Sequence, residues 1–74
     1  MRMRIRLETY NEVRDFVKIC SCIEEPVFLK DGNDFCVSGK SMLGGIASLE
    51  WEQLYCESTN PHLHFLLKKF ALKI

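Results

Sequence analysis

The sequence predicts an α+β domain: an open-faced β-sandwich of order βαββαβα, with a four-stranded antiparallel sheet and three helices on one face. Two observations predict the sheet. The first seven residues alternate apolar and basic side chains, as a half-buried strand does, and an Asp-Gly-Asn-Asp turn at residues 31–34 separates two short apolar runs, as in a hairpin. A third observation predicts the helices, because apolar side chains recur at helical spacing in later segments.

Length and composition limit the classes of protein to which the chain can belong. Its 74 residues are enough for one small domain, residues 1–74, and 47% of them are hydrophobic. Ten Lys and Arg residues balance ten Asp and Glu residues, so a nucleic-acid partner, which normally requires a basic excess, is not expected. No apolar run reaches the roughly 20 residues of a membrane span and no signal peptide is recognisable, so we expect no membrane insertion and a cytoplasmic location.

The first strand and the first helix are strongly patterned. Residues 1–7 form the alternating strand, and the Thr-Tyr-Asn-Glu sequence that follows at residues 9–12 matches a capping box, in which Thr9 and Glu12 satisfy the free amides of a helix start. Helical spacing of apolar side chains predicts a helix over residues 10–22, which ends before Pro26. The outward face of the strand carries three arginines: Arg2, Arg4 and Arg6.

The middle of the chain predicts a hairpin followed by a short helix. Residues 26–30 and 35–38 are its two strands. Ser41 is suited to be the N-cap of the helix, because a serine hydroxyl accepts a hydrogen bond from a free amide of the first turn. The doubled glycine at residues 44–45 costs roughly 1 kcal/mol per residue relative to alanine, so we expect a short, soft helix. Its apolar side chains are Met42, Leu43, Ile46, Ala47 and Leu49.

The last part of the chain predicts one more strand and one more helix. The strand spans residues 51–57, and Trp51 would serve either as a core residue or as an interface anchor. The helix has Asn60 as its N-cap and Pro61 at its first position, where proline is favoured. Its buried face is expected to consist of Leu63, Leu66, Leu67, Phe70 and Ile74.

One segment resembles a known family. Residues 37–44, Val-Ser-Gly-Lys-Ser-Met-Leu-Gly, continue into Ile-Ala-Ser-Leu at residues 46–49. This pattern, a Lys-Ser-x-x-Gly segment running into a Ser-Leu pair before the last strand, resembles the histidine-containing phosphocarrier protein family (HPr) of the sugar phosphotransferase system. The resemblance implies the same βαββαβα sandwich and covers nearly the whole chain, with one extra residue from the doubled glycine.

The resemblance implies a first site at the start of the first helix. In the family, a histidine there accepts phosphate from a phosphoenolpyruvate-driven enzyme and passes it to sugar transporters, and an arginine two residues on helps to hold the phosphoryl group. In this sequence the position falls among Thr9, Tyr10 and Asn11, so the acceptor histidine is absent and Arg14 is the nearest phosphate-binding candidate. Thr, Tyr and Asn lack the nucleophilic imidazole nitrogen that titrates near neutral pH, so we expect no ordinary phosphocarrier activity.

The resemblance implies a second site at Ser41. This serine matches the one that a dedicated kinase phosphorylates in many Gram-positive members. A phosphate at a helix N-terminus meets free amides and the positive end of the helix dipole. We therefore expect a divergent member that acts by regulatory docking to phosphotransferase-system or catabolite-control proteins. The expected contact residues around Ser41 are Lys40, Met42, Leu43 and Ile46.

Two alternatives remain open. The chain is either a phosphocarrier with an unusual acceptor, for which His62 and His64 are the candidates, or a small interaction module that shares only the fold. The arginine stripe of the first strand would bind phosphate or an acidic partner, or simply stay solvated. No Ser/His/Asp set, phosphate-binding glycine loop or carboxylate pair is present, so neither an independent catalytic site nor a cofactor is expected.

Four cysteines, at positions 20, 22, 36 and 56, bear on the redox state and on metal binding. Without a secretory signal, free thiols are expected rather than disulfides. The Cys-x-Cys spacing of Cys20 and Cys22 differs from the common Cys-x-x-Cys of zinc and redox sites, so no metal site is expected.

Overall fold

A computed structural model describes residues 2–72, and over that range the elements follow the order β1, α1, β2, β3, α2, β4, α3 and a final 3₁₀ turn, η1. The predicted α+β class and the βαββαβα order are confirmed. The strands are β1 (Arg2–Arg4), β2 (Val27–Lys30), β3 (Cys36–Ser38) and β4 (Tyr55–Ser58). The helical elements are α1 (Tyr10–Ser21), α2 (Met42–Ser48), α3 (Leu63–Leu66) and η1 (Lys68–Phe70).

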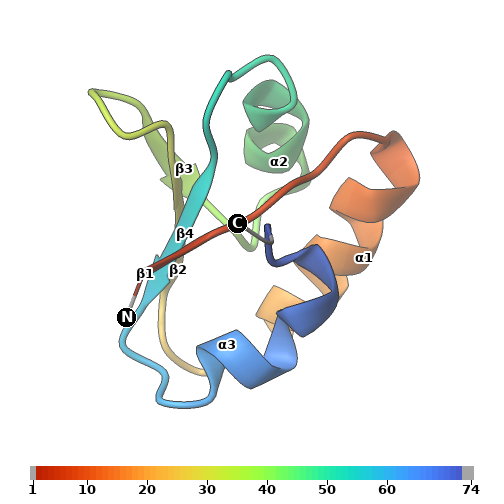
Figure 1. The fold of residues 1–74 in the computed structure, drawn as a ribbon. Coiled ribbons are helices and arrows are strands. Elements are labelled where there is room, and N and C mark those ends of the chain that lie inside the picture. Colours follow the sequence, from red (N-terminus) through yellow and green to blue (C-terminus); the bar gives the residue numbers. More distant parts are fainter. Residues whose placement is uncertain (1, 73–74) are drawn as a thin grey trace.

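The strands form one antiparallel sheet in the order β1-β4-β2-β3, so β4 lies between the first strand and the hairpin. Cys56 is paired with Met3 on one side and with Leu29 on the other, and all three side chains are buried. The three helices lie on one side of this sheet (Figure 1). The predicted open-faced sandwich is thus confirmed for residues 2–72.

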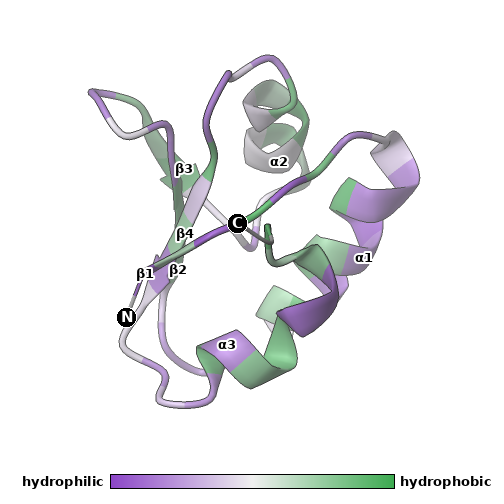
Figure 2. Ribbon diagram, viewed as in Figure 1, coloured by the Kyte–Doolittle hydropathy of each residue, from purple (hydrophilic) through white to green (hydrophobic). Residues whose placement is uncertain are grey.

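The core lies between the sheet and the helices. The amphipathic spacing in α1 turns its buried side chains towards the sheet, and Figure 2 shows the hydrophobic side of α1 facing inward and its hydrophilic side facing outward. Phe16, which is completely buried, meets Phe70 of η1 edge to face, with 5.4 Å between the ring centroids. This aromatic contact holds the end of the chain against α1. The buried residues of α1 are Val13, Phe16, Val17 and Cys20.

The last strand is shorter than predicted. It begins at Tyr55 rather than at Trp51, because the backbone amide of Trp51 donates to the carbonyl of Ser48 (3.1 Å) and so continues the turn that ends α2. Residues 52–53 form a bend, and only then does the chain enter the sheet. The expectation of a strand over residues 51–57 is corrected to Tyr55–Ser58.

The last helix also differs from the prediction. It begins at Leu63 and not at Pro61, because the Asn60 side chain accepts a hydrogen bond from the His62 amide (2.7 Å) and closes a local turn before the helix. After four residues the chain tightens into η1, which buries Phe70 but leaves Leu66 40% exposed. Ile74, predicted on the same face, lies outside the described residues, as does Met1 of the first strand.

The tightening at η1 places residues 70–72 beside the first strand. Ala71 forms a β-bridge with Ile5, and the Leu72 amide donates to the Arg4 carbonyl (3.0 Å). The Arg6 amide donates to Phe70 (2.9 Å) in the same way. This short pairing satisfies backbone groups at the edge of the sheet next to β1, which a continuous last helix would not do.

Candidate functional site

Ser41 caps α2, as the sequence predicts. Its backbone is extended (φ −107°, ψ 125°), and its Oγ accepts a hydrogen bond from the Gly44 amide at 3.2 Å. The Ser41 amide in turn donates to the Ser38 carbonyl at 3.2 Å, which ties the cap to the end of β3. The Ser41 side chain is partly exposed, so the hydroxyl is both a structural cap and reachable from solvent.

The doubled glycine, which is expected to make α2 short and soft, also lets it pack closely on both neighbours. A Cβ on Gly44 would lie 3.1 Å from the Ser38 carbonyl oxygen and from the Val37 side chain, and a Cβ on Gly45 would meet Val13 of α1. The helix therefore settles between α1 and β3 at distances that side chains would prevent. Close packing is a second consequence of these two residues, beside their cost in helix propensity, and α2 is short as expected.

The expected docking residues of α2 divide between two faces. Leu43 is 82% exposed in the first turn, and Ile46 is 37% exposed one turn later. Met42 is partly buried and packs against the core. Leu43 and Ile46 thus form a small apolar surface beside Ser41, and we call these two residues the α2 surface.

Lys40 is expected to belong to the same contact, and its ammonium group points towards the loop after α1. Its Nζ donates to the Ile23 carbonyl and lies 3.5 Å from the Glu24 carbonyl oxygen. Both carbonyls belong to the loop that follows α1, where a lysine ammonium complements the carbonyl end of a helix. The ammonium therefore ties the start of α2 to the end of α1.

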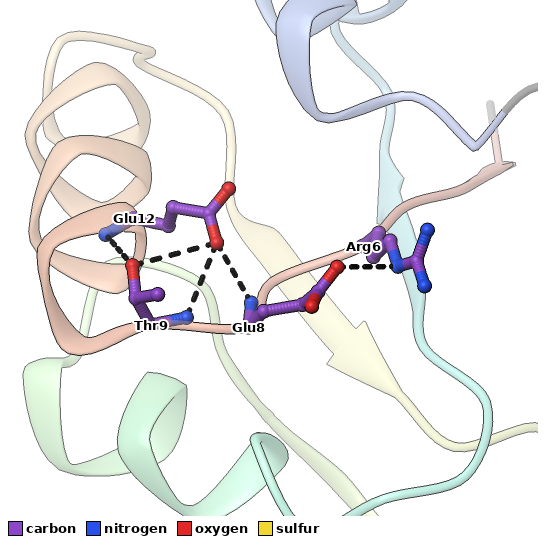
Figure 3. Close-up of polar contacts among 4 residues, drawn as sticks. All are labelled: Arg6, Glu8, Thr9 and Glu12. Carbon is purple, nitrogen blue, oxygen red and sulfur yellow. Dashed lines mark hydrogen bonds and ion pairs between the residues drawn. The ribbon is translucent and has the colours of Figure 1, made fainter.

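At the start of α1, where the resemblance places the acceptor histidine, the carboxylate of Glu12 accepts hydrogen bonds from backbone amides. The capping box is confirmed: the Glu12 amide donates to Thr9 Oγ1 (3.2 Å), and Glu12 Oε1 accepts from the amides of Thr9 (3.1 Å) and Glu8 (2.9 Å) (Figure 3). Glu8 also pairs with Arg6 at 2.7 Å (Figure 3). The Glu12 carboxylate thus occupies amides that a phosphoryl anion would otherwise use.

Tyr10, Asn11 and Arg14 are the other residues that the resemblance places at this corner. Tyr10 and Asn11 are exposed. Arg14 lies on the outer side of α1, 57% exposed, with its Nε 3.9 Å from the carboxylate of Asp15. The carboxylate of Asp15, which is on the same helix as Arg14, also lies 3.8 Å from Lys69 Nζ. The role of Arg14 in phosphate binding stays a prediction.

The two histidines lie in another part of the molecule. His62 and His64 are both exposed at the start of α3. Figure 1 shows the start of α3 well separated from the start of α1, so neither histidine is brought to the corner at Thr9. They form no joint site with Arg14.

The open face of the sheet carries charged side chains whose partners the sequence only partly predicted. The predicted outward direction of Arg2 is confirmed, and its guanidinium lies over the Tyr55 ring, 4.0 Å from the centroid. Lys30 pairs with Glu57 at 3.1 Å on the same face. Strand alternation in β2 and β4 was the signal that could have located these partners.

Further candidates lie at the hairpin and among the thiols. The rings of Phe35 and Trp51 are stacked, with 6.1 Å between centroids, and the sequence indicated only Trp51.

All four cysteines are free, as expected, and Cys20 and Cys56 are buried while Cys22 and Cys36 are exposed. Burial raises the pKa of both buried thiols to about 12.

Neither a metal cluster nor a membrane span is found over residues 2–72. No group of three or more His, Cys, Asp or Glu side chains in this range is placed to hold a metal ion. Within the same range, no helix has both the length and the apolar content that crossing a bilayer requires. No protein-family model matches the chain, and no curated protein or solved structure matches it.

Proposed function

We propose that this chain is a protein-docking module related to the HPr family, which contacts its partner through the α2 surface and Ser41 and carries no phosphate on histidine. The observation that carries the proposal is the 82% exposure of Leu43 in the helix turn that Ser41 caps. Together with Ile46, this side chain offers a partner an apolar contact next to a hydroxyl that can be modified.

The electrostatics at the start of α1 support the part of the proposal that concerns phosphate. The Glu12 carboxylate accepts hydrogen bonds from the Glu8 and Thr9 amides, and a phosphoryl group brought to this corner would face that negative charge. Like charges within a few ångströms repel, so a phosphorylated state would be disfavoured here. We therefore infer that the family's phosphoryl-transfer step is lost and its docking role is kept.

Incubation with phosphoenolpyruvate and the first enzyme of the phosphotransferase system tests the loss of transfer. We expect no acid-labile label on this chain, in a reaction where an ordinary HPr is labelled as the positive control. Acid-labile label that disappears in His62→Gln or His64→Gln would establish the alternative, a phosphocarrier with an unusual acceptor.

Capture of cytoplasmic partners tests the docking role. Wild-type protein is compared with Leu43→Ser, which removes the exposed apolar side chain, and with Phe65→Ser as a matched control, since Phe65 is 77% exposed on α3. Recovery of transporter or catabolite-control proteins by wild type and Phe65→Ser but not by Leu43→Ser supports the proposal. Recovery of unrelated partners only would favour the second alternative, a module that shares the fold alone.

Labelling by the family's serine kinase tests the regulatory part. We expect labelling of wild type and none of Ser41→Ala, because Ser41 offers a partly exposed hydroxyl at a helix start. Equal labelling of the two proteins would exclude Ser41 as the modified residue.

A further inference from the structure

The β2–β3 hairpin turn and the loop after α2 enclose a depression that no part of the proposed docking role uses. The stacked rings of Phe35 and Trp51 form one side of it, inclined by 21° to each other. Its volume is about 330 Å³, and the remaining lining consists of Asp31, Glu52, Gln53 and residues 32–33. We call this depression the hairpin pocket.

The walls of the hairpin pocket are held by the surrounding turn. Asp31 Oδ1 accepts hydrogen bonds from the amides of Asn33 (2.8 Å) and Phe35 (3.2 Å), which fixes the carboxylate at the rim. Gly32 adopts φ 91° and sits so close to Tyr55 that a Cβ there would lie 3.1 Å from the ring. The Tyr55 hydroxyl donates to Gln53 Oε1 (3.0 Å). The carboxylate and the turn are therefore positioned before any ligand arrives.

The two charged side chains that line the hairpin pocket are both acidic. Asp31 and Glu52 line it, Asp34 and Glu50 lie beside them in the sequence, and residues 31–35 and 50–53 contain no Lys or Arg. Among residues 2–72, no Lys or Arg lies within ion-pair distance of these four carboxylates. The aromatic faces and the unpaired carboxylates complement the same kind of ligand, a cation with a flat or apolar body.

We propose that the hairpin pocket binds an arginine side chain from a basic segment of a partner protein. A guanidinium is planar, stacks on an aromatic face and bonds a carboxylate through two parallel N–H groups, so it uses both kinds of wall together. A lysine ammonium is compact and strongly hydrated, and it uses only the charge. This inference does not depend on the α2 surface or on modification of Ser41.

The chain carries its own reporter for this binding, because Trp51 is its one tryptophan. Emission of Trp51 is followed while acetyl-(Gly-Arg)₃-amide is added at low salt, with acetyl-(Gly-Lys)₃-amide and acetyl-(Gly-Gln)₃-amide as matched peptides. We expect a saturable change with the arginine peptide, weaker binding of the lysine peptide, and none with the glutamine peptide. Raising the salt to 0.5 M is expected to weaken the binding, because exposed charges are screened.

Two matched substitutions show whether the pocket itself is the site. Glu52→Gln removes an exposed lining carboxylate and is expected to weaken binding of the arginine peptide about three- to fivefold, the upper range for an exposed ion pair. Glu50→Gln removes the same charge outside the lining and is expected to change the affinity less than about twofold, as an exposed charge does. Circular dichroism establishes that both variants keep the wild-type fold. A linear, non-saturable response, an equal response to the glutamine peptide, or equal effects of the two substitutions would each overturn the proposal.

Discussion

Gly45 of α2 lies against Val13 of α1 so closely that a Cβ added to the glycine would come within 2.6 Å of Val13 Cγ1. Real Cβ atoms do not approach that near, so only glycine permits this contact between the two helices. Val13 is completely buried and has little room to move. The position of α2, and with it the exposed setting of Ser41 and Leu43, therefore depends on this pair.

Gly45→Ala is expected to destabilise the protein by up to about 2 kcal/mol, although alanine favours helix. Overpacking against Val13 costs about 1–3 kcal/mol, and the roughly 1 kcal/mol that the helix gains in propensity offsets only part of that cost. Urea unfolding followed by circular dichroism measures the difference. Gly44→Ala is the neighbouring control, because its Cβ would meet other atoms only at 3.1 Å and the loss should be smaller.

The double variant Val13→Ala/Gly45→Ala isolates the contact. Removing the Val13 methyl groups makes room for the new Cβ, so the loss in the double variant should be clearly smaller than the sum of the two single losses. Additive losses would mean that the contact does not set the position of α2.

The first half of the fold could be predicted because its signals are local. The alternation in residues 1–7 and the capping box of Thr9 and Glu12 each depend on a few neighbouring residues. The capping box is present and burial alternates over residues 2–7, although the strand expected over residues 1–7 is corrected to Arg2–Arg4. The cap at Ser41 is equally local, since a serine before a helix bonds an amide three residues on. Where short-range chemistry decides the backbone, the sequence is enough to read it.

The features that the sequence did not predict depend on distant contacts. The close packing of Gly45 could not be predicted, because its partner, Val13, is 32 positions away and no local pattern shows the contact. The apolar spacing of the last helix predicts one continuous helix. That spacing does not show that residues 71–72 pair with the backbone of Arg4 and Ile5. The direction of the Lys40 ammonium likewise depends on a loop 17 positions earlier. Tertiary contacts override local propensity at each of these places.

Ser41→Ala is expected to lower the free energy of unfolding by about 1 kcal/mol, the usual cost of losing a side-chain N-cap. Ser41→Asp should keep most of that stability, because a carboxylate accepts the Gly44 amide and complements the helix dipole. Urea unfolding of the three proteins checks both expectations. A loss in Ser41→Asp as large as that in Ser41→Ala would show that an anion is not tolerated at this cap, and would count against regulation by phosphorylation.

Thiol titration with a disulfide reagent at pH 8 should find two fast and two slow cysteines. Cys22 and Cys36 are exposed, while Cys20 and Cys56 are completely buried and burial raises their pKa to about 12, so little reactive thiolate forms there. Urea should release the two slow thiols. The double variant Cys22→Ser/Cys36→Ser should show no fast reaction. A thiol that still reacts fast in this variant would be Cys20 or Cys56, and would mean that the core around it opens readily.

The same two buried thiols predict a loss of stability in alkaline solution. Above the ordinary pKa of 9.0, the unfolded chain releases the protons of Cys20 and Cys56, whereas the folded protein keeps them up to a pKa of about 12. The unfolded state then binds fewer protons than the folded state, so the free energy of unfolding falls as pH rises, by at most about 1.4 kcal/mol per pH unit for each thiol. Below pH 9 this contribution is fully present.

Urea unfolding between pH 8 and pH 10.5 measures that slope against two single-thiol variants. Cys56→Ala should be less stable than wild type at every pH, because it leaves a cavity in the core beneath β4, but its alkaline slope should be about half as steep since one of the two protons is gone. Cys36→Ala removes a thiol that is exposed in the folded protein and should leave the slope unchanged. An equal slope in wild type and Cys56→Ala would show that the pKa of Cys56 is the same in the folded protein as in the unfolded chain.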